Sequence, residues 1–143
     1  RWAKGIKPGT ACDVPVTSTD FYPTILEMAG LDPLPSQHCD GVSLMPLLSG
    51  NANLERDAIF WHYPHYGNQG GTPASSVRCG KYKLIEFFED NRIELYDLDS
   101  DISEKHEISD KLPQIRNKLH AMLKNWRDQC DAAIPQPNPD YHA

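Results

Sequence analysis

The architecture of this chain follows from residues 75–98, SSVRCGKYKLIEFFEDNRIELYDL. This stretch holds three runs rich in β-branched and aromatic residues, joined by links of three and four residues. Runs of this composition favour strands, and links this short are typical of hairpin turns, so consecutive strands should be antiparallel. One similar run precedes the stretch. The sequence therefore predicts a four-stranded antiparallel sheet, with strands at residues 58–61, 75–78, 82–88 and 93–96.

Beyond the sheet, apolar residues recur at helical spacing from Asp110 onwards, with cations between them. This pattern predicts an amphipathic helix that lies across the sheet, with Trp126 buried between the helix and the sheet and Arg127 on the solvent-exposed face. The fold class is therefore α+β, a four-stranded antiparallel sheet packed by a C-terminal helix. The apolar positions are Leu112, Ile115, Leu119, Met122, Leu123 and Trp126.

A short helix is predicted upstream, over residues 21–29. Cap residues at 17–20 precede it, Pro23 suits a first turn and Gly30 suits a C-terminal stop. Its circumference is mostly apolar, so we expect it to be buried against a part of the protein that lies outside this chain. Residues 40–50 resemble a turn that leads into a short capped helical segment.

We divide the chain into residues 1–55, a terminal piece with a connector, residues 56–131, the sheet and its helix, and residues 132–143, a Pro-rich tail. The tail can form neither a helix nor a central strand, so it is either an extended strap or a loose end. The chain has 143 residues and starts at Arg1 without Met, and we expect it to be a piece of a longer protein.

The net charge of −6 leaves no basic field for nucleic acid, and no apolar run is long enough to span a membrane. Neither partner is expected. The four cysteines are scattered without a CxxC pair, which disfavours a zinc site and leaves both free thiols and disulfides open. They are Cys12, Cys39, Cys79 and Cys130.

The candidate recognition element is the run of residues 61–71, WHYPHYGNQGG. It crowds imidazoles, phenols and amides into a segment too rich in glycine for a helix, which favours ligand contact, with a packed aromatic turn as the alternative. A metal site at His62 and His65 is disfavoured, because Pro64 lies between them and no third ligand is near.

Two other groups of charged residues give weaker indications. Asp97, Asp99 and Asp101 imitate the start of an EF-hand loop, but the glycine and glutamate that such a loop needs are absent, so a strand end and turn are expected instead. Arg78 and Lys81 flank a tight turn and are either an anion contact or solvated charges. No nucleophile, P-loop or dinucleotide motif is present.

A set of short motifs runs along the chain in a fixed order. They are Lys7-Pro8-Gly9-Thr10, Pro23-Thr24-Ile25-Leu26 with Ala29-Gly30, Asp40-Gly41-Val42-Ser43-Leu44, Pro46-Leu47-Leu48, Gly80-Lys81-Tyr82-Lys83-Leu84-Ile85 and Glu94-Leu95-Tyr96-Asp97-Leu98. Each is common by itself, but their order closely resembles the C-terminal half of type I sulfatases, the arylsulfatase-like branch of the alkaline-phosphatase superfamily. The resemblance extends to about Trp126.

The resemblance implies that residues 1–55 complete a large α/β catalytic domain and that the sheet and helix form a smaller C-terminal subdomain. In that family the nucleophile is a formylglycine made within Cys/Ser-x-Pro-x-Arg, a motif absent here, and calcium is held by earlier segments. We therefore expect no catalytic residue and no metal ligand in this chain, and no activity from it alone. The resemblance makes His62, His65, Tyr66 and Asn68 candidates for contacting the sulfated small molecule or glycan.

Two alternatives stay open at this stage. The parent could be a related hydrolase of phosphate or phosphonate esters, since the motifs of a lid domain do not distinguish sulfur from phosphorus. The chain could also be a stand-alone carbohydrate-binding module. The resemblance leaves periplasmic, extracellular and lysosomal locations equally open for the parent.

Overall fold

The structure, a computed structural model, describes residues 2, 5–37, 40–51, 53–136 and 138–140. The chain divides into two compact units, Arg1–Arg56 and Asp57–Ala143, which we describe separately. Cys12, Cys79 and Cys130 are free thiols, and Cys39 lies outside the described residues. Within the described part of the chain, no helix is long and apolar enough to cross a membrane.

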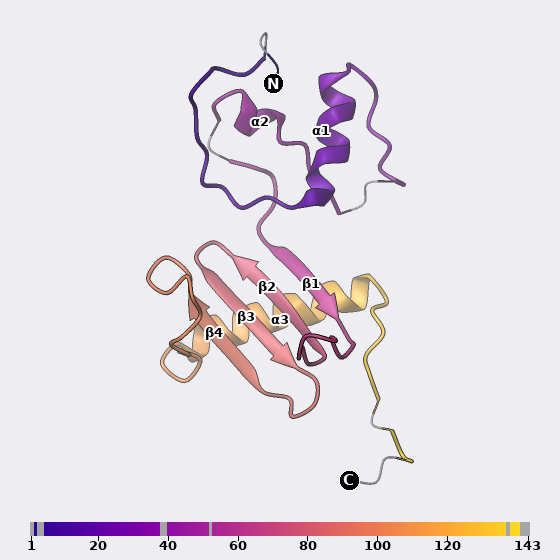
Figure 1. Ribbon diagram of the computed structural model, residues 1–143, viewed down its shortest axis with the longest axis vertical. Helices are drawn as coiled ribbons and strands as arrows, with labels where there is room; N and C mark the ends of the chain where they lie inside the picture. Colours follow the sequence, from indigo (N-terminus) through magenta and orange to yellow (C-terminus); the bar gives the residue numbers. More distant parts are fainter. Residues whose placement is uncertain (1, 3–4, 38–39, 52, 137, 141–143) are drawn as a thin grey trace. The chain divides into compact units, whose positions relative to one another are not determined.

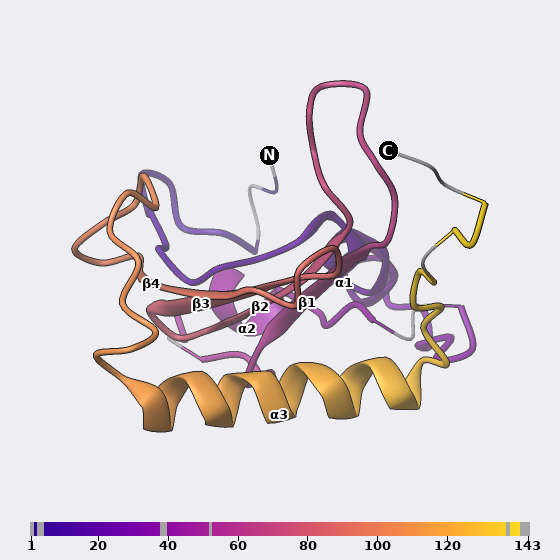
Figure 2. The same cartoon turned by 90° about the horizontal axis from the view of Figure 1, so that it is seen from below.

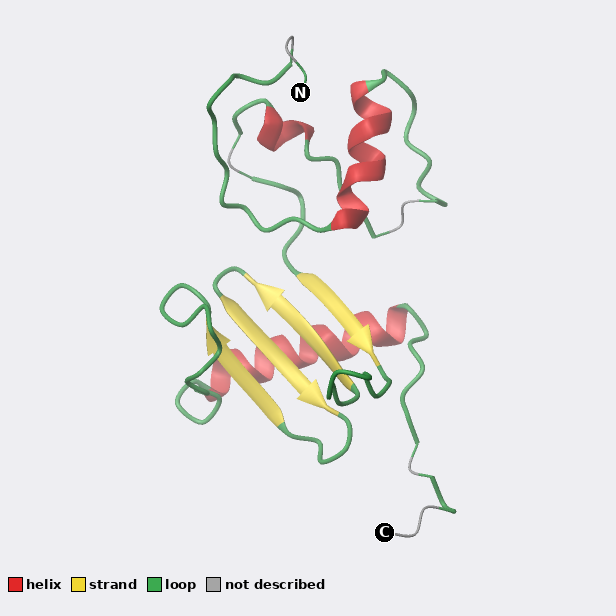
Figure 3. Ribbon diagram, in the orientation of Figure 1, coloured by secondary structure: helices red, strands yellow, loops and turns green. Residues whose placement is uncertain are grey.

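The second unit is built on a four-stranded antiparallel sheet in the order β1-β2-β3-β4 (Figures 1 and 3). The turn between β2 and β3 is tight, and its Gly80 has a φ of 57°, which favours glycine. The predicted antiparallel sheet is confirmed. The strands are β1 (Ile59–Tyr63), β2 (Ala74–Cys79), β3 (Tyr82–Phe87) and β4 (Ile93–Asp97).

Helix α3 (Pro113–Gln129) lies along one face of this sheet, as Figure 2 shows with the sheet seen edge-on. Three neighbouring strands each place one fully buried side chain beneath it, because residues in register share a face. Burying each such side chain contributes about 1.5–3 kcal/mol. The α+β fold predicted from the sequence is confirmed. The buried core consists of Val77, Leu84, Leu95, Leu119 and Leu123.

Two side chains of α3 differ from expectation. Trp126 is half-buried at the edge of the core, where its ring stacks on Phe60 at a centroid distance of 5.0 Å. Arg127, expected on the side of water, is buried with 7% of its surface exposed. The reason is helical geometry, because Arg127 continues the i, i+4, i+8 row that starts with Leu119 and Leu123 and faces the sheet.

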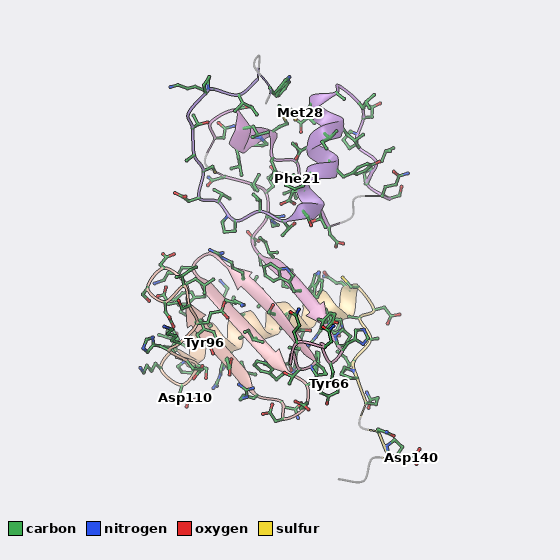
Figure 4. The ribbon with its side chains drawn as sticks, in the orientation of Figure 1. Phe21, Met28, Tyr66, Tyr96, Asp110 and Asp140 are labelled. Atoms are coloured by element: carbon green, nitrogen blue, oxygen red, sulfur yellow. The ribbon has the colours of Figure 1, made fainter. Side chains whose placement is uncertain are left out.

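The first unit contains η1 (Ser18–Asp20), α1 (Phe21–Met28) and α2 (Met45–Leu48). Both predicted helical segments are present. Phe21 of α1 (Figure 4) is 56% exposed and Ile25 is 61% exposed, and the cover expected for this helix is a part of the protein outside this chain. The polar Thr24 is buried instead, because its hydroxyl donates to the Asp20 carbonyl and accepts the Leu44 N–H.

Candidate functional site

The loop that joins β1 to β2 projects from the sheet on the side opposite α3 (Figure 2). Two backbone hydrogen bonds close its tip, from the Gly67 N–H to the Gly71 carbonyl at 2.8 Å and from the Gly70 N–H to the Gly67 carbonyl at 3.1 Å. Gly70 has a φ of 87°, a conformation that L side chains rarely adopt. The glycines noted in the sequence therefore fold the tip back on itself. We call residues 64–73 the projecting loop.

Three of the four candidate contact residues lie exposed on the projecting loop. Tyr66 is 69% exposed, and its hydroxyl donates to Oε1 of Glu89 at 2.7 Å (Figure 4). The His65 ring meets the Tyr63 ring edge-on, with the centroids 5.4 Å apart, and Asn68 is exposed at the tip. This part of the loop presents imidazole, phenol and amide groups, which can donate to and accept from sugar hydroxyls or sulfate oxygens.

The structure does not bring His62 together with the other three. His62 lies within β1, and its ring nitrogens both have protein partners, Ser75 Oγ at 2.5 Å from Nδ1 and the Ala133 carbonyl at 2.9 Å from Nε2. The edge of its ring also packs on Phe88. The β1 alternation places His62 on the face of Phe60, which is the face that α3 covers.

A buried polar cluster beneath α3 was missed from the sequence. Glu86 on β3 is 9% exposed, and its carboxylate oxygens lie 3.1 Å from Nε2 of His120 and 2.7 Å from Nη2 of Arg127. Burial alone would raise the pKa of Glu86, but the adjacent His120 and the charge of Arg127 hold this pKa below its ordinary value. The extension of the apolar row to Arg127 was the signal that could have revealed the cluster.

The charged turns are occupied by local partners. Lys81 Nζ lies 2.6 Å from Oδ2 of Asp97, and this hydrogen bond lowers the pKa of Asp97. Arg78 Nε donates to the Gly80 carbonyl at 3.4 Å. Asp101 accepts the N–H groups of residues 105 and 106 through one carboxylate oxygen, as a turn does. Among the described residues, no group of three or more His, Cys, Asp or Glu side chains could hold a metal ion.

Comparisons with known proteins give one consistent result. The family model described as N-sulphoglucosamine sulphohydrolase, C-terminal, matches residues 1–129. The chain is 31% identical to a sulfatase from Formosa agariphila, over 87% of this chain and 27% of that protein. It is 30% identical to N-acetylglucosamine-6-O-sulfatase from Bacteroides thetaiotaomicron, over 90% and 25%, and 32% identical to arylsulfatase K from Homo sapiens, over 95% and 27%.

A solved structure shares the fold. It is a protein in complex with its substrate D-glucosamine-2-N,6-O-disulfate, and it matches with a TM-score of 0.78 at 29% identity, over 90% of this chain and 27% of that chain. A 2-O glycosaminoglycan sulfatase matches with a TM-score of 0.67 at 26% identity, over 79% and 25%. The chain thus spans about a quarter of the length of these relatives.

Proposed function

This chain belongs to the sulfatase family and corresponds to the C-terminal part of a sulfatase. On that premise we propose that the protein that contains it hydrolyses sulfate esters of a sugar. The observation that carries the proposal is the match of residues 1–129 to a sulfatase C-terminal domain. The relatives are named for sulfate and not for phosphate, which favours sulfur over the phosphorus alternative. Two of them point to glucosamine, so a sulfated glucosamine unit is the proposed substrate class.

Catalysis is assigned to an upstream domain of the parent. The relatives extend over about four times the length of this chain, which leaves room for such a domain. Among the described residues, no three His, Cys, Asp or Glu side chains come together as a group that could hold a metal ion. Calcium and the formylglycine nucleophile are therefore proposed to belong to the upstream domain, and this chain supplies scaffold and substrate contacts.

The exposed face of α1 supports an upstream partner within the same protein. Phe21, Tyr22 and Ile25 are 56%, 41% and 61% exposed on a helix that buries Pro23 and Thr24 within the first unit. Leaving such side chains in water forgoes about 1.5–3 kcal/mol each, so a covering surface would stabilise the unit. The upstream domain is the proposed cover, and Ile25→Asp in the parent should lower the yield of folded protein.

The projecting loop is the proposed contact with substrate. His65, Tyr66 and Asn68 offer donors and acceptors on an exposed segment whose tip and base are tied by backbone hydrogen bonds. Such a loop can present side chains with little loss of conformational entropy when a ligand binds. The proposed role is orientation of the sugar, with the reacting sulfur held by the upstream domain.

The test is an assay of the purified full-length parent with glucosamine 6-O-sulfate, glucosamine N-sulfate and glucosamine 6-phosphate. Sulfate release from the first or second substrate, absent when the upstream nucleophile is changed to alanine, is expected. This chain expressed alone should release none. Phosphate release without sulfate release would overturn the proposal, and glucosamine binding by this chain alone, in a parent without hydrolase activity, would favour the carbohydrate-binding module instead.

A further inference from the structure

His62 and Ser75 close the base of the projecting loop. In the register of β1 and β2, His62 lies directly opposite Ser75, one residue before β1 ends and one residue after β2 begins. The short contact between Nδ1 and Ser75 Oγ therefore joins the two arms of the loop by their side chains. Ser75 is only 2% exposed, so little water competes for this bond.

The C-terminal tail is tied to the same point. After α3 ends, the Ala132 N–H donates to the Arg127 carbonyl at 3.0 Å, and the Ala133 carbonyl then meets His62 Nε2 at 2.9 Å. Figure 1 shows the segment after α3 passing along the β1 side of the sheet. The start of the tail is thus a strap, held at one end by the helix and at the other by the loop base.

The partners fix the protonation of the neutral His62 ring. A backbone carbonyl only accepts, so Nε2 must carry the proton that faces Ala133. In the neutral ring Nδ1 then has a lone pair and accepts from the Ser75 hydroxyl. With both nitrogens engaged, the ring has no polar atom left for a substrate. This geometry fits a role for His62 in holding the tail and the projecting loop together better than it fits direct contact with the substrate.

A second pair of contacts encloses the base. Phe88, which follows β3, donates its N–H to the Pro73 carbonyl at the end of the loop, at 3.0 Å. Its ring packs against the His62 ring at a centroid distance of 5.7 Å and lies beneath the Arg127 guanidinium. The tail and the link after β3 therefore meet at His62, and α3 reaches the same place through the contact of Arg127 with Phe88.

We propose that His62 is a positioning residue, which couples the strap at residues 132–133 to the projecting loop and so holds the loop in the conformation that receives substrate. The kinetic consequences rest on the proposed function, whereas the order of the loop does not. Removing the strap and removing the Nε2 contact should then have the same effect on the loop, although they change residues far apart in the sequence.

Four variants of the full-length parent separate the contacts of His62. In His62→Asn the amide reaches the Nδ1 position but stops short of Ala133, whereas in His62→Gln the amide reaches the Nε2 position and can still bond the strap. A chain ended after Asp131 lacks the strap, and a chain ended after Gln136 keeps Ala133 and serves as the matched control. The readouts are amide hydrogen exchange over residues 64–72 and the steady-state constants on a glucosamine sulfate.

We expect His62→Asn and the chain ended after Asp131 each to speed exchange in the loop and to raise KM about fivefold to tenfold, the loss of one hydrogen bond, with little change in kcat. Their combination should be no worse than either alone. His62→Gln and the chain ended after Gln136 should stay within about threefold of the parent.

Unchanged loop exchange in the chain ended after Asp131 would overturn the proposal, and this variant alters no residue of the sheet, so it decides even if His62→Asn fails to fold. Raised KM in both His62 variants with a neutral truncation would also overturn it, by making His62 a direct substrate contact. A parent that releases no sulfate would sink the proposed function, while the hydrogen exchange would still decide the coupling.

Discussion

Asp20 and Arg56, 36 residues apart in the sequence, form a two-point ion pair, with Nη1–Oδ1 at 2.7 Å and Nη2–Oδ2 at 3.0 Å. Asp20 is fully buried, and its carboxylate also accepts the N–H groups of Thr17 and Val42. Arg56 further donates to the Pro15 carbonyl. The Asp20 carboxylate therefore joins three segments of the first unit, which contain Thr17, Val42 and Arg56.

Asp20→Asn should destabilise the parent strongly. The amide keeps the size of the side chain but leaves the largely buried Arg56 guanidinium without its counter-charge, and breaking a buried pair in this way typically costs about 3–5 kcal/mol. Asp32→Asn, at an exposed position, is the matched control and should change little. The denaturant midpoints of both variants check this, and equal midpoints would show that the ion pair does not hold the unit together.

Arg127→Met should destabilise the second unit. The substitution keeps an apolar stem against the sheet but removes the guanidinium that faces Glu86, and a buried carboxylate left with a weaker partner costs about 3 kcal/mol or more. Lys124→Met lies one turn earlier on the exposed side of α3 and provides the control. Thermal unfolding of the two variants should separate them clearly, whereas similar melting temperatures would count against the cluster.

Glu86 should make stability depend on acid pH. Burial acts to raise the pKa of Glu86, but His120 and Arg127 prevail and hold it below the ordinary value of 4.5. The stability from the charged form is therefore fully present above 4.5 and is lost as the pH falls through the lower folded value. At neutral pH the parent should have a higher free energy of unfolding than Glu86→Gln. This difference should shrink as the pH falls below 4.5 and through the lowered pKa of Glu86. A constant difference between them from neutral to acid pH would refute this linkage.

The sequence predicted the sheet well because its signal is local. Val77, Leu84 and Leu95 each lie in a run of strand-forming residues, and glycine or short polar links between the runs leave little choice of topology. The position of Arg127 could not be read in the same way. A charged residue on an amphipathic helix is normally solvated, and its burial depends on Glu86, which lies on another element.

The candidate site was predicted only in part for a related reason. Composition identified the projecting loop, and glycine explains its folded tip. Composition could not show that His62 belongs to β1 and not to the projecting loop. The two partners that hold its ring, Ser75 and Ala133, are 13 and 71 residues away in the sequence. His62 and His65 have the same chemistry and lie in one run of sequence, so the sequence suggested one role for both. In the structure His62 lies in β1, where strand alternation turns it toward the face that α3 covers, and His65 lies in the projecting loop.

Trp126→Ala should cost about 2 kcal/mol. Complete removal of a core tryptophan typically costs about 3–5 kcal/mol, but this ring is half-buried, and its main contact is the stack on Phe60. The full burial of Trp126 that the sequence predicts would imply a larger loss. Ile102→Ala, at a side chain that is 74% exposed, is the control and should be nearly neutral. The free energies of unfolding test both values, and a loss from Trp126→Ala no greater than that of the control would contradict the packing.

His65→Ala in the full-length parent should lower kcat/KM on a glucosamine sulfate about tenfold, a loss of about 1.4 kcal/mol of transition-state binding. The melting temperature should hardly change, because His65 is exposed and its ring contact is with Tyr63 on the open face of the sheet. Gln69→Ala, in the same loop and also exposed, controls for general disturbance of the segment.

The pattern of the two constants then locates the contact. An equal fall in kcat and kcat/KM would mean that His65 meets the sugar only in the transition state, whereas a rise in KM alone would mean that it holds the substrate equally before and during reaction. Since Asn68 is also exposed on the projecting loop, Asn68→Ala should act in the same direction as His65→Ala. If neither substitution alters either constant, the projecting loop lies away from the substrate and its polar side chains serve only the fold.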